Sequence, residues 1–220
     1  INYAALTQYV KTLEDCLEEV NDGKKIKINI KLVETVSNDS SFVSHNYFTS
    51  MPIDPNQTFP NFVVGRSNAQ AQIASLTCAS NLGLVYNPLF IYGDSGLGKT
   101  HLLNAIGNHV KKVFPNKKIC YTTGLSFVEG VHKAEIEKKY DEFKESFNDV
   151  DVLLIDDIQF IAGKPKTHEI FFTVFNNLIS NKKQICITCD KTPSEIKGLE
   201  DRIISRFNQG LTVNIEAPEY

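Results

Sequence analysis

The sequence lacks any long hydrophobic run and any strong excess of one charge. No apolar stretch approaches the roughly 20 residues that a membrane-spanning helix needs, and no signal peptide pattern is present. We therefore expect a cytoplasmic protein. The formal net charge of −3 excludes a basic clamp that holds duplex DNA with the whole chain, so any contact with nucleic acid must be local.

The cysteines and histidines show no pattern of a disulfide framework or a metal site. The five cysteines are an odd number in apolar surroundings, which is typical of a reducing cytosol. Cys186 and Cys189 form a C-x-x-C pair, but they lie in a run typical of a buried strand, where residues three apart face opposite sides. We expect core cysteines here rather than a redox or zinc site. The five histidines likewise show no metal-ligand spacing.

The sequence predicts three segments. Residues 1–36 combine a helical pattern with an alternating strand and are too short for an independent domain, so we expect the remnant of a small α/β domain. Residues 37–57 are polar, rich in Ser, Asn and Pro, and predict a flexible linker. Residues 58–220 predict the main domain. The chain opens without Met, and we expect a fragment of a longer protein.

The main domain shows short apolar runs that alternate with helical segments. This pattern predicts an α/β fold in which a parallel five-stranded sheet is flanked by helices on both faces. The expected strands lie at residues 88–93, 117–123, 150–157, 184–190 and 211–216.

The strongest motif is G-x-x-x-x-G-K-T, from Gly93 to Thr100. It follows an apolar strand and runs directly into an apolar-periodic helix, which is the context that a phosphate-binding P-loop requires. Gly93, Gly96 and Gly98 let the backbone N–H groups point at phosphate oxygens near a helix N-terminus. Lys99 would contact the β and γ phosphates, and the Thr100 hydroxyl would bind Mg²⁺. The motif predicts a site for ATP or ADP with Mg²⁺.

Two adjacent carboxylates follow the strand at residues 150–157. Because ligands bind at the carboxyl ends of parallel strands, Asp156 is placed to hold Mg²⁺ and Asp157 to polarise an attacking water. The alternative is a solvated pair, although neighbouring carboxylates are costly without a compensating cation or donor. The strand at 184–190 ends in Thr188 and Asp190. If it lies between the two strands just described, Asp190 reaches the γ-phosphate region and reports on its occupancy.

Three separated stretches, residues 87–108, 150–179 and 198–219, together resemble the AAA+ ATPase domain of the DnaA family of bacterial chromosome replication initiators. The resemblance covers about residues 58–220 and rests on several motifs in the same order. It implies a weak ATPase that initiates chromosomal DNA replication. The ATP form would assemble with itself into a helical oligomer on origin DNA and promote duplex opening, and hydrolysis would switch it off.

The resemblance also implies what lies outside the chain. The sequence stops before the family's helical lid, which carries the sensor-2 arginine, and before the domain that binds duplex origin DNA. Residues 1–36 are similar to the end of the family's N-terminal interaction domain. Further partners implied by the family are the replicative helicase and acidic membrane lipids.

Carried onto this sequence, the resemblance assigns roles to particular residues. It makes Asp156 and Asp157 the Walker B pair and Asp190 sensor 1, which act with Lys99 and Arg206 in catalysis. Phe62, Val63 and Val64 would pack beside the adenine. The implied nucleotide contacts are Val64, Gly93, Gly96, Leu97, Gly98, Lys99, Thr100 and His101.

The resemblance further implies an extra helix after the second strand that holds single-stranded DNA. Val131 and Lys133 occupy the expected contact positions, joined by Lys164 and Lys166. The alternative for these lysines is an ordinary solvated surface.

Arg202 and Arg206 lie four residues apart on an expected short helix, so their side chains share one face. Arg206 matches the family's arginine finger, which acts on the nucleotide of a neighbouring subunit. Arg202 would lie at the same subunit interface. The alternative is an intramolecular ion pair with Glu200, Asp201 or a nearby helix.

Two rival functions share the phosphate motif. A replicative helicase loader has the same core, but residues 205–219 and the segment before the first strand favour the initiator. A P-loop kinase or a GTPase is the more distant rival. Residues 180–184, "SNKKQ", resemble the guanine-reading N-K-x-D motif only superficially, because they precede their strand and end in Gln.

Overall fold

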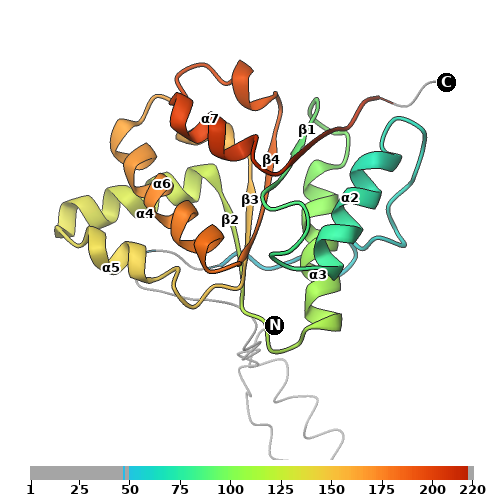
Figure 1. Cartoon of the computed structure of the whole chain (residues 1–220), viewed down its shortest axis with the longest axis horizontal. Helices are drawn as coiled ribbons and strands as arrows, with labels where there is room; N and C mark the ends of the chain where they lie inside the picture. The colour runs from blue at the N-terminus through green and yellow to red at the C-terminus, as the bar shows by residue number, and fades with distance from the viewer. Residues whose placement is uncertain (1–46, 48–49, 218–220) are drawn as a thin grey trace, which may run out of the picture. The chain divides into compact units, whose positions relative to one another are not determined.

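The computed structural model describes residue 47 and residues 50–217, which all belong to one unit spanning residues 40–220. Its five strands pair in parallel in the order β2-β3-β4-β1-β5 (Figure 1). This confirms the parallel sheet that the apolar runs predict. The strands are β1 (Leu89–Tyr92), β2 (Ile119–Thr123), β3 (Val152–Asp156), β4 (Gln184–Cys189) and β5 (Leu211–Asn214).

Helices cover both faces of the sheet, as predicted (Figure 1). One face carries α2 (Ala69–Ser80) and α3 (Lys99–Val113). The other carries α4 (Gly124–Glu137), α5 (Tyr140–Glu145), α6 (Pro165–Ser180) and α7 (Asp201–Phe207), with short 3-10 turns η1 (Ile158–Ile161) and η2 (Pro193–Glu195). Within the described part of the chain, no helix has the length and apolar character to cross a membrane.

The alternation of side chains along each strand separates two hydrophobic cores. Every residue of β3 is buried. Leu153 and Ile155 join the cluster under α4, α6 and α7, whereas Val152 and Leu154 join the cluster under α2 and α3. A strand buried on both sides reads as one continuous apolar run, which explains why the sequence pattern was so clear.

The same alternation accounts for the C-x-x-C pair. Cys186 lies in the cluster under α2 and α3, where its Sγ is 3.5 Å from that of Cys78, and Cys189 lies in the opposite cluster. Burial raises the pKa of Cys189. Both residues are therefore core cysteines on different faces of the sheet, as the strand pattern predicts, while Cys16 lies outside the described residues.

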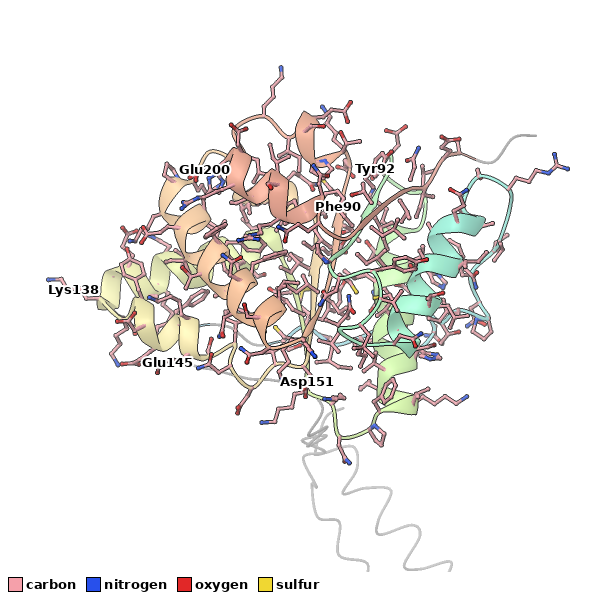
Figure 2. All side chains as sticks on the ribbon, in the orientation of Figure 1. Phe90, Tyr92, Lys138, Glu145, Asp151 and Glu200 are labelled. Atoms are coloured by element: carbon pink, nitrogen blue, oxygen red, sulfur yellow. The ribbon has the colours of Figure 1, made fainter. Side chains whose placement is uncertain are left out.

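Aromatic packing fixes α7 on the sheet and on α6. The buried Phe207 ring lies 5.2 Å from that of Phe90 on β1, and 5.9 and 6.0 Å from those of Phe171 and Phe175 on α6, between ring centroids. Figure 2 labels Phe90. The last turn of α7 is thus anchored by one buried ring, and its arginines are held on the opposite, outer side of the helix.

The core begins earlier than the predicted residue 58. The Met51 N–H donates to the Tyr121 backbone oxygen at 2.7 Å, and the Asp54 N–H donates to Asn104 Oδ1 at 2.9 Å. Residues 50–57 are therefore bound to β2 and α3, and the prediction of a flexible linker does not hold for them. Their polar composition concealed this, because most of the contacts are hydrogen bonds. Residues 1–36 and 37–49, apart from Tyr47, lie outside the described residues.

Ile53 supplies the apolar part of this attachment. Its side chain is buried against α3 at Gly107, where a Cβ added to the glycine would lie only 2.4 Å from Ile53 Cδ1. We predict that Ile53→Ala lowers the free energy of unfolding by about 2 kcal/mol, because a buried aliphatic side chain leaves a cavity when truncated. Urea denaturation would measure it. Met51→Ala, at a neighbouring half-exposed position, is the matched control, and equal small effects for both variants would contradict the attachment.

Candidate functional site

The loop between β1 and α3 is shaped by three glycines with positive φ. Gly93, Gly96 and Gly98 have φ values of 151°, 82° and 97°. A Cβ at Gly93 would lie 2.2 Å from the Ile215 carbonyl oxygen, and a Cβ at Gly98 would lie 2.9 Å from the Phe62 ring. Other residues are excluded at these two positions by both conformation and space. The loop delivers the chain to the N-terminus of α3, where the free N–H groups and the helix dipole favour an anion.

Lys99 is the first residue of α3 and is only 6% exposed. Its Nζ donates to the backbone oxygens of Gly93 at 2.7 Å and Asp94 at 2.9 Å, and to Asp190 Oδ1 at 2.8 Å. The ammonium therefore lies across the inside of the loop and links it to the end of β4. A phosphate group entering the loop would compete with the two carbonyl oxygens for the same three donor hydrogens.

Asp190 reaches this position because β4 lies between β3 and β1. The sheet order confirms the strand placement on which its predicted role depends. Tyr92, labelled in Figure 2 at the carboxyl end of β1, pairs with Cys189, so Asp190 emerges directly beside the P-loop. Asp151, labelled in the same figure, precedes β3 at the other end of the sheet.

Asp156 is buried at the end of β3 and accepts hydrogen bonds from two threonines. Thr100 Oγ1 donates to its Oδ2 at 2.8 Å, and Thr188 Oγ1 donates to its Oδ1. Tyr121 OH lies 3.4 Å from Oδ2. Burial, with the Asp156 charge as a further cause, raises the pKa of Tyr121 to about 12, so this hydroxyl stays neutral.

The oxygens of Thr100 and Asp156 fit a magnesium ion. A hydroxyl and a carboxylate are hard oxygen ligands, and here they already lie within hydrogen-bond distance of each other. Among the described residues, no group of three or more His, Cys, Asp or Glu side chains gathers as a metal site. This donor set therefore suits an ion that takes most of its ligands from phosphate and water, as Mg²⁺ does.

Asp157 follows in a left-handed backbone conformation, with φ of 53°. Its N–H donates to Thr188 Oγ1 at 3.0 Å, so one threonine contacts both acidic residues. Burial raises the pKa of the Asp157 carboxyl, a hydrogen bond from Gln159 lowers it, and the nearby charges of Asp156 and Asp190 raise it again. A carboxylate with a raised pKa is a better proton acceptor, as the predicted role in polarising water requires.

Sequence reasoning missed Gln159. Its Nε2 donates to Asp157 Oδ1 at 3.1 Å and to Asp190 Oδ2 at 3.2 Å, so the amide joins the two acidic ends of β3 and β4. The available signal was its polarity within the otherwise apolar turn Ile158–Ile161. Only the fold of η1, which brings the side chain back over the strand end, reveals the contact.

Two clefts border the P-loop, and Asp190 lines both of them. The first measures about 730 Å³ and extends from Gly93, Asp94 and Leu97 to residues 214–217, after β5. The second measures about 380 Å³ and contains the groups predicted to act on phosphate. Its lining includes Gly96, Lys99, Thr100, Asp157, Gln159 and Asp190.

The residues expected beside the adenine have different environments. Phe62 is buried under the P-loop, with its ring 5.2 Å from that of His101. Val63 is 85% exposed and Val64 51% exposed, and neither lines the two clefts. Leu97 lines the first cleft, and His101 lines the second. Phe62 thus supports the loop from below, and the nucleotide contacts of Val64, Leu97 and His101 stay predictions.

The expected DNA contacts after the second strand need one correction. Val131 is 3% exposed and packs in the core beneath α4, so it is not available to DNA. Residues two apart on a helix point to different sides, and Lys133 accordingly lies on the outer face. Its Nζ is 5.8 Å from the centre of the Tyr47 ring. α4 and the shorter α5 occupy the stretch where an extra helix was expected.

Lys164 and Lys166 lie at the start of α6 and are exposed, but both have partners in the same chain. Lys164 Nζ donates to the Phe160 backbone oxygen at 2.7 Å. Lys166 Nζ pairs with Glu169 at 2.8 Å and lies 4.6 Å from the centre of the Tyr140 ring. DNA binding by these lysines stays a prediction, and it would require exchange of these surface contacts.

Arg202 and Arg206 share one face of α7, as their spacing predicts. Both guanidinium groups lie over the Phe172 ring of α6, at 4.9 and 5.5 Å from its centre. Arg202 Nε also donates to Glu200 Oε2 at 2.6 Å, which is the intramolecular ion pair considered as the alternative; Figure 2 labels Glu200. Arg206 donates to Gln209 Oε1 at 3.2 Å and, within the described residues, has no carboxylate within 4.0 Å. Neither arginine lines the two clefts.

Comparison with known proteins identifies similar sequences over the same region. The family described as "Bacterial DnaA ATPase domain" matches residues 53–214. The chromosomal replication initiator protein DnaA of Methylobacillus flagellatus is 52% identical over 167 residues, which are 76% of this chain and 36% of that protein. The chain therefore spans little more than a third of this relative's length.

Solved structures extend the similarity to three dimensions. Domain III of the Thermotoga maritima replication initiation protein DnaA is 44% identical with a TM-score of 0.75, covering 77% of this chain and 70% of that one. A replication initiator DnaA bound to AMPPCP and single-stranded DNA is 39% identical with a TM-score of 0.71, covering 75% and 51%. The DnaC helicase loader, at 17% identity and a TM-score of 0.60, shares the fold alone; the match covers 73% of this chain and 96% of that one.

Proposed function

Because the chain belongs to the bacterial DnaA ATPase-domain family, we propose that it is the ATP-binding and ATP-hydrolysing core of a chromosomal replication initiator. The observation that carries the proposal is the hydrogen-bonded network at the P-loop. Lys99 joins the loop to Asp190, and Thr100 joins it to Asp156. These contacts gather a phosphate-binding cation, a magnesium-binding pair and a candidate base at one edge of the sheet.

Each of these residues has a distinct task in hydrolysis. The P-loop N–H groups and Lys99 bind the β and γ phosphates, and Thr100 with Asp156 would hold Mg²⁺, which neutralises phosphate charge when bound. Asp157 accepts a proton from the attacking water. Asp190 releases Lys99 to the γ phosphate and so responds to its presence. Gly96, Leu97 and His101 border the same nucleotide from the loop and from α3.

We place Arg206, with Arg202 beside it, at the interface with a neighbouring subunit. In this chain the two guanidinium groups lie over Phe172 and outside both clefts. An arginine that serves its own nucleotide would have to line the phosphate cleft. The arrangement therefore favours action in trans, in which ATP joins one subunit to the next and favours a helical oligomer.

The DNA that this assembly binds is origin DNA. A DnaA relative has been solved with single-stranded DNA, and on this chain the exposed Lys133, Lys164 and Lys166 are the basic groups that we assign to the same contact. Duplex origin DNA would bind through a domain outside the chain. Contacts with a replicative helicase and with acidic membrane lipids, and a place in the cytoplasm, follow from the same family role.

This proposal can be tested by sedimentation of the longest natural form of the protein, with ATP, with ADP and without nucleotide. We expect larger species only with ATP, and tighter binding of single-stranded DNA with ATP than with ADP. Sedimentation that does not depend on nucleotide would contradict an ATP switch. A P-loop kinase would instead show no cooperative response to DNA in either nucleotide state.

A further inference from the structure

Gln159 occupies the space between the two acidic residues that face the γ-phosphate region. Its amide nitrogen donates to Asp157 Oδ1 and to Asp190 Oδ2 at 3.1 and 3.2 Å. An amide nitrogen has two hydrogens, so these two carboxylates use both of them. The orientation of the amide is thereby fixed, because turning it over would place its oxygen against two negatively charged groups.

The other end of the amide has no hydrogen-bond partner among the residues that the structure describes. Gln159 Oε1 is shielded from solvent and forms no hydrogen bond with any described residue. A buried acceptor without a donor lowers stability, so the two donor contacts that hold the amide in this place call for a functional explanation. The same side chain lines the second cleft together with Lys99, Thr100 and Asp157.

We propose that Gln159 is a positioning residue of ATP hydrolysis, whose Nε2 holds the Asp157 carboxylate where it receives a proton from the attacking water. The inference rests on the proposed function and adds one residue to it. Because the amide holds Oδ1 of Asp157, the other carboxylate oxygen, Oδ2, is the acceptor for the attacking water.

The reaction step is a direct displacement. The water oxygen forms a bond to the γ phosphorus, and the bond between that phosphorus and the oxygen bridging to the β phosphate breaks. One water proton passes to Asp157, the other stays on the inorganic phosphate, and the bridging oxygen leaves as part of ADP. Gln159 is unchanged by the step, because it supplies orientation and takes no proton.

Gln159 also connects the step to nucleotide sensing. Lys99 and Gln159 bind different oxygens of the same Asp190 carboxylate. When phosphate draws Lys99 from Asp190, that carboxylate keeps Gln159 as its donor. The amide then holds Asp157 and Asp190 together in the bound state.

Two variants of the 220-residue chain separate a positioning role in hydrolysis from a merely structural one. Gln159→Leu keeps the approximate size and removes donor and acceptor. We expect ATP and ADP affinities within about threefold of the wild type, and a single-turnover hydrolysis rate, measured with protein in excess, lower by about a hundredfold. Gln70→Ala, an exposed glutamine of α2, is the matched control and should change neither quantity.

Gln159→Glu gives a readout that does not require hydrolysis. A third carboxylate facing the γ position should weaken ATP binding by about tenfold and change ADP binding by less than about twofold, because ADP lacks the phosphate that meets the new charge. Titration with fluorescent ATP and ADP analogues measures both affinities. If Gln159→Leu does not fold, the ratio of ATP affinity to ADP affinity in Gln159→Glu is enough to test the assignment.

Equal weakening of ATP and ADP by Gln159→Glu, or wild-type hydrolysis by Gln159→Leu, would overturn the assignment. Failure of the proposed function looks different. In that case the unaltered chain itself binds neither nucleotide, which overturns the proposed function and the role of Gln159 together.

Discussion

Arg206→Ala should lower ATP hydrolysis within the assembly by about a thousandfold while ATP binding to the isolated chain is unchanged. The guanidinium group lies over Phe172 at 5.5 Å, outside the clefts of its own chain, so its removal leaves the local phosphate site intact. In the role proposed for Arg206, the variant loses a positive charge that would stabilise the transition state in the neighbouring subunit. Steady-state phosphate release with single-stranded DNA present, and nucleotide titration without it, measure the two quantities.

A mixing experiment shows whether Arg206 acts on the nucleotide of its own subunit or on that of a neighbouring subunit. Arg206→Ala protein has an intact phosphate site without a finger, and Lys99→Ala protein has an intact finger without a working site. Each should be inactive alone, and the mixture should regain hydrolysis at the boundaries where a Lys99→Ala subunit supplies Arg206 to its neighbour. Arg66→Ala, at an exposed position before α2, is the matched control. Loss of ATP affinity in isolated Arg206→Ala protein would place the arginine in its own site.

Lys99→Ala should reduce ATP affinity by at least about a hundredfold, because the charge-assisted hydrogen bonds to phosphate are each worth about 1.5 to 3 kcal/mol. The circular dichroism spectrum should be unchanged, since α3 continues through an alanine without difficulty. Equilibrium titration with a fluorescent ATP analogue is the measurement. ATP binding at wild-type affinity would mean that the nucleotide site lies elsewhere.

Lys112→Ala is the control for this variant. Lys112 is an exposed lysine on the last turn of the same helix, so its removal changes the net charge equally but leaves the P-loop untouched. The difference between the two variants therefore reports the position of the charge rather than its amount. Lys112→Ala should bind ATP as the unaltered chain does.

The sheet and the P-loop could be predicted from the sequence because their signals are local. Strands buried on both faces are continuous apolar runs, and the glycine spacing from Gly93 to Gly98 is set by the backbone of one loop. The position of Asp190 required only one further fact, the order of the strands. That order is consistent with the family resemblance and is now given by the structure.

Other features depend on contacts between residues that are far apart in the sequence. The sequence predicted these features wrongly or did not predict them. Residues 50–57 look like a linker because their partners, such as Asn104, lie on another element. Val131 was expected to contact DNA because the resemblance indicates a position in the sequence and not a face of the helix. In the structure this position faces the hydrophobic core. Gln159 was missed because its contacts arise from a single 3-10 turn, whose conformation no short pattern predicts.

The helix α6 has a mechanical consequence for an assembled protein. Its first residue, Pro165, follows closely after η1, which carries Gln159, and its side bears Phe172, on which both arginines rest. α6 is one continuous helix of 16 residues. A shift of η1 when this subunit's nucleotide changes would therefore be transmitted along α6 to the arginines assigned to the next subunit. Nucleotide binding in one subunit would then change the position of Arg202 and Arg206 at the proposed interface with the next subunit. The effect would pass along the helical oligomer in one direction.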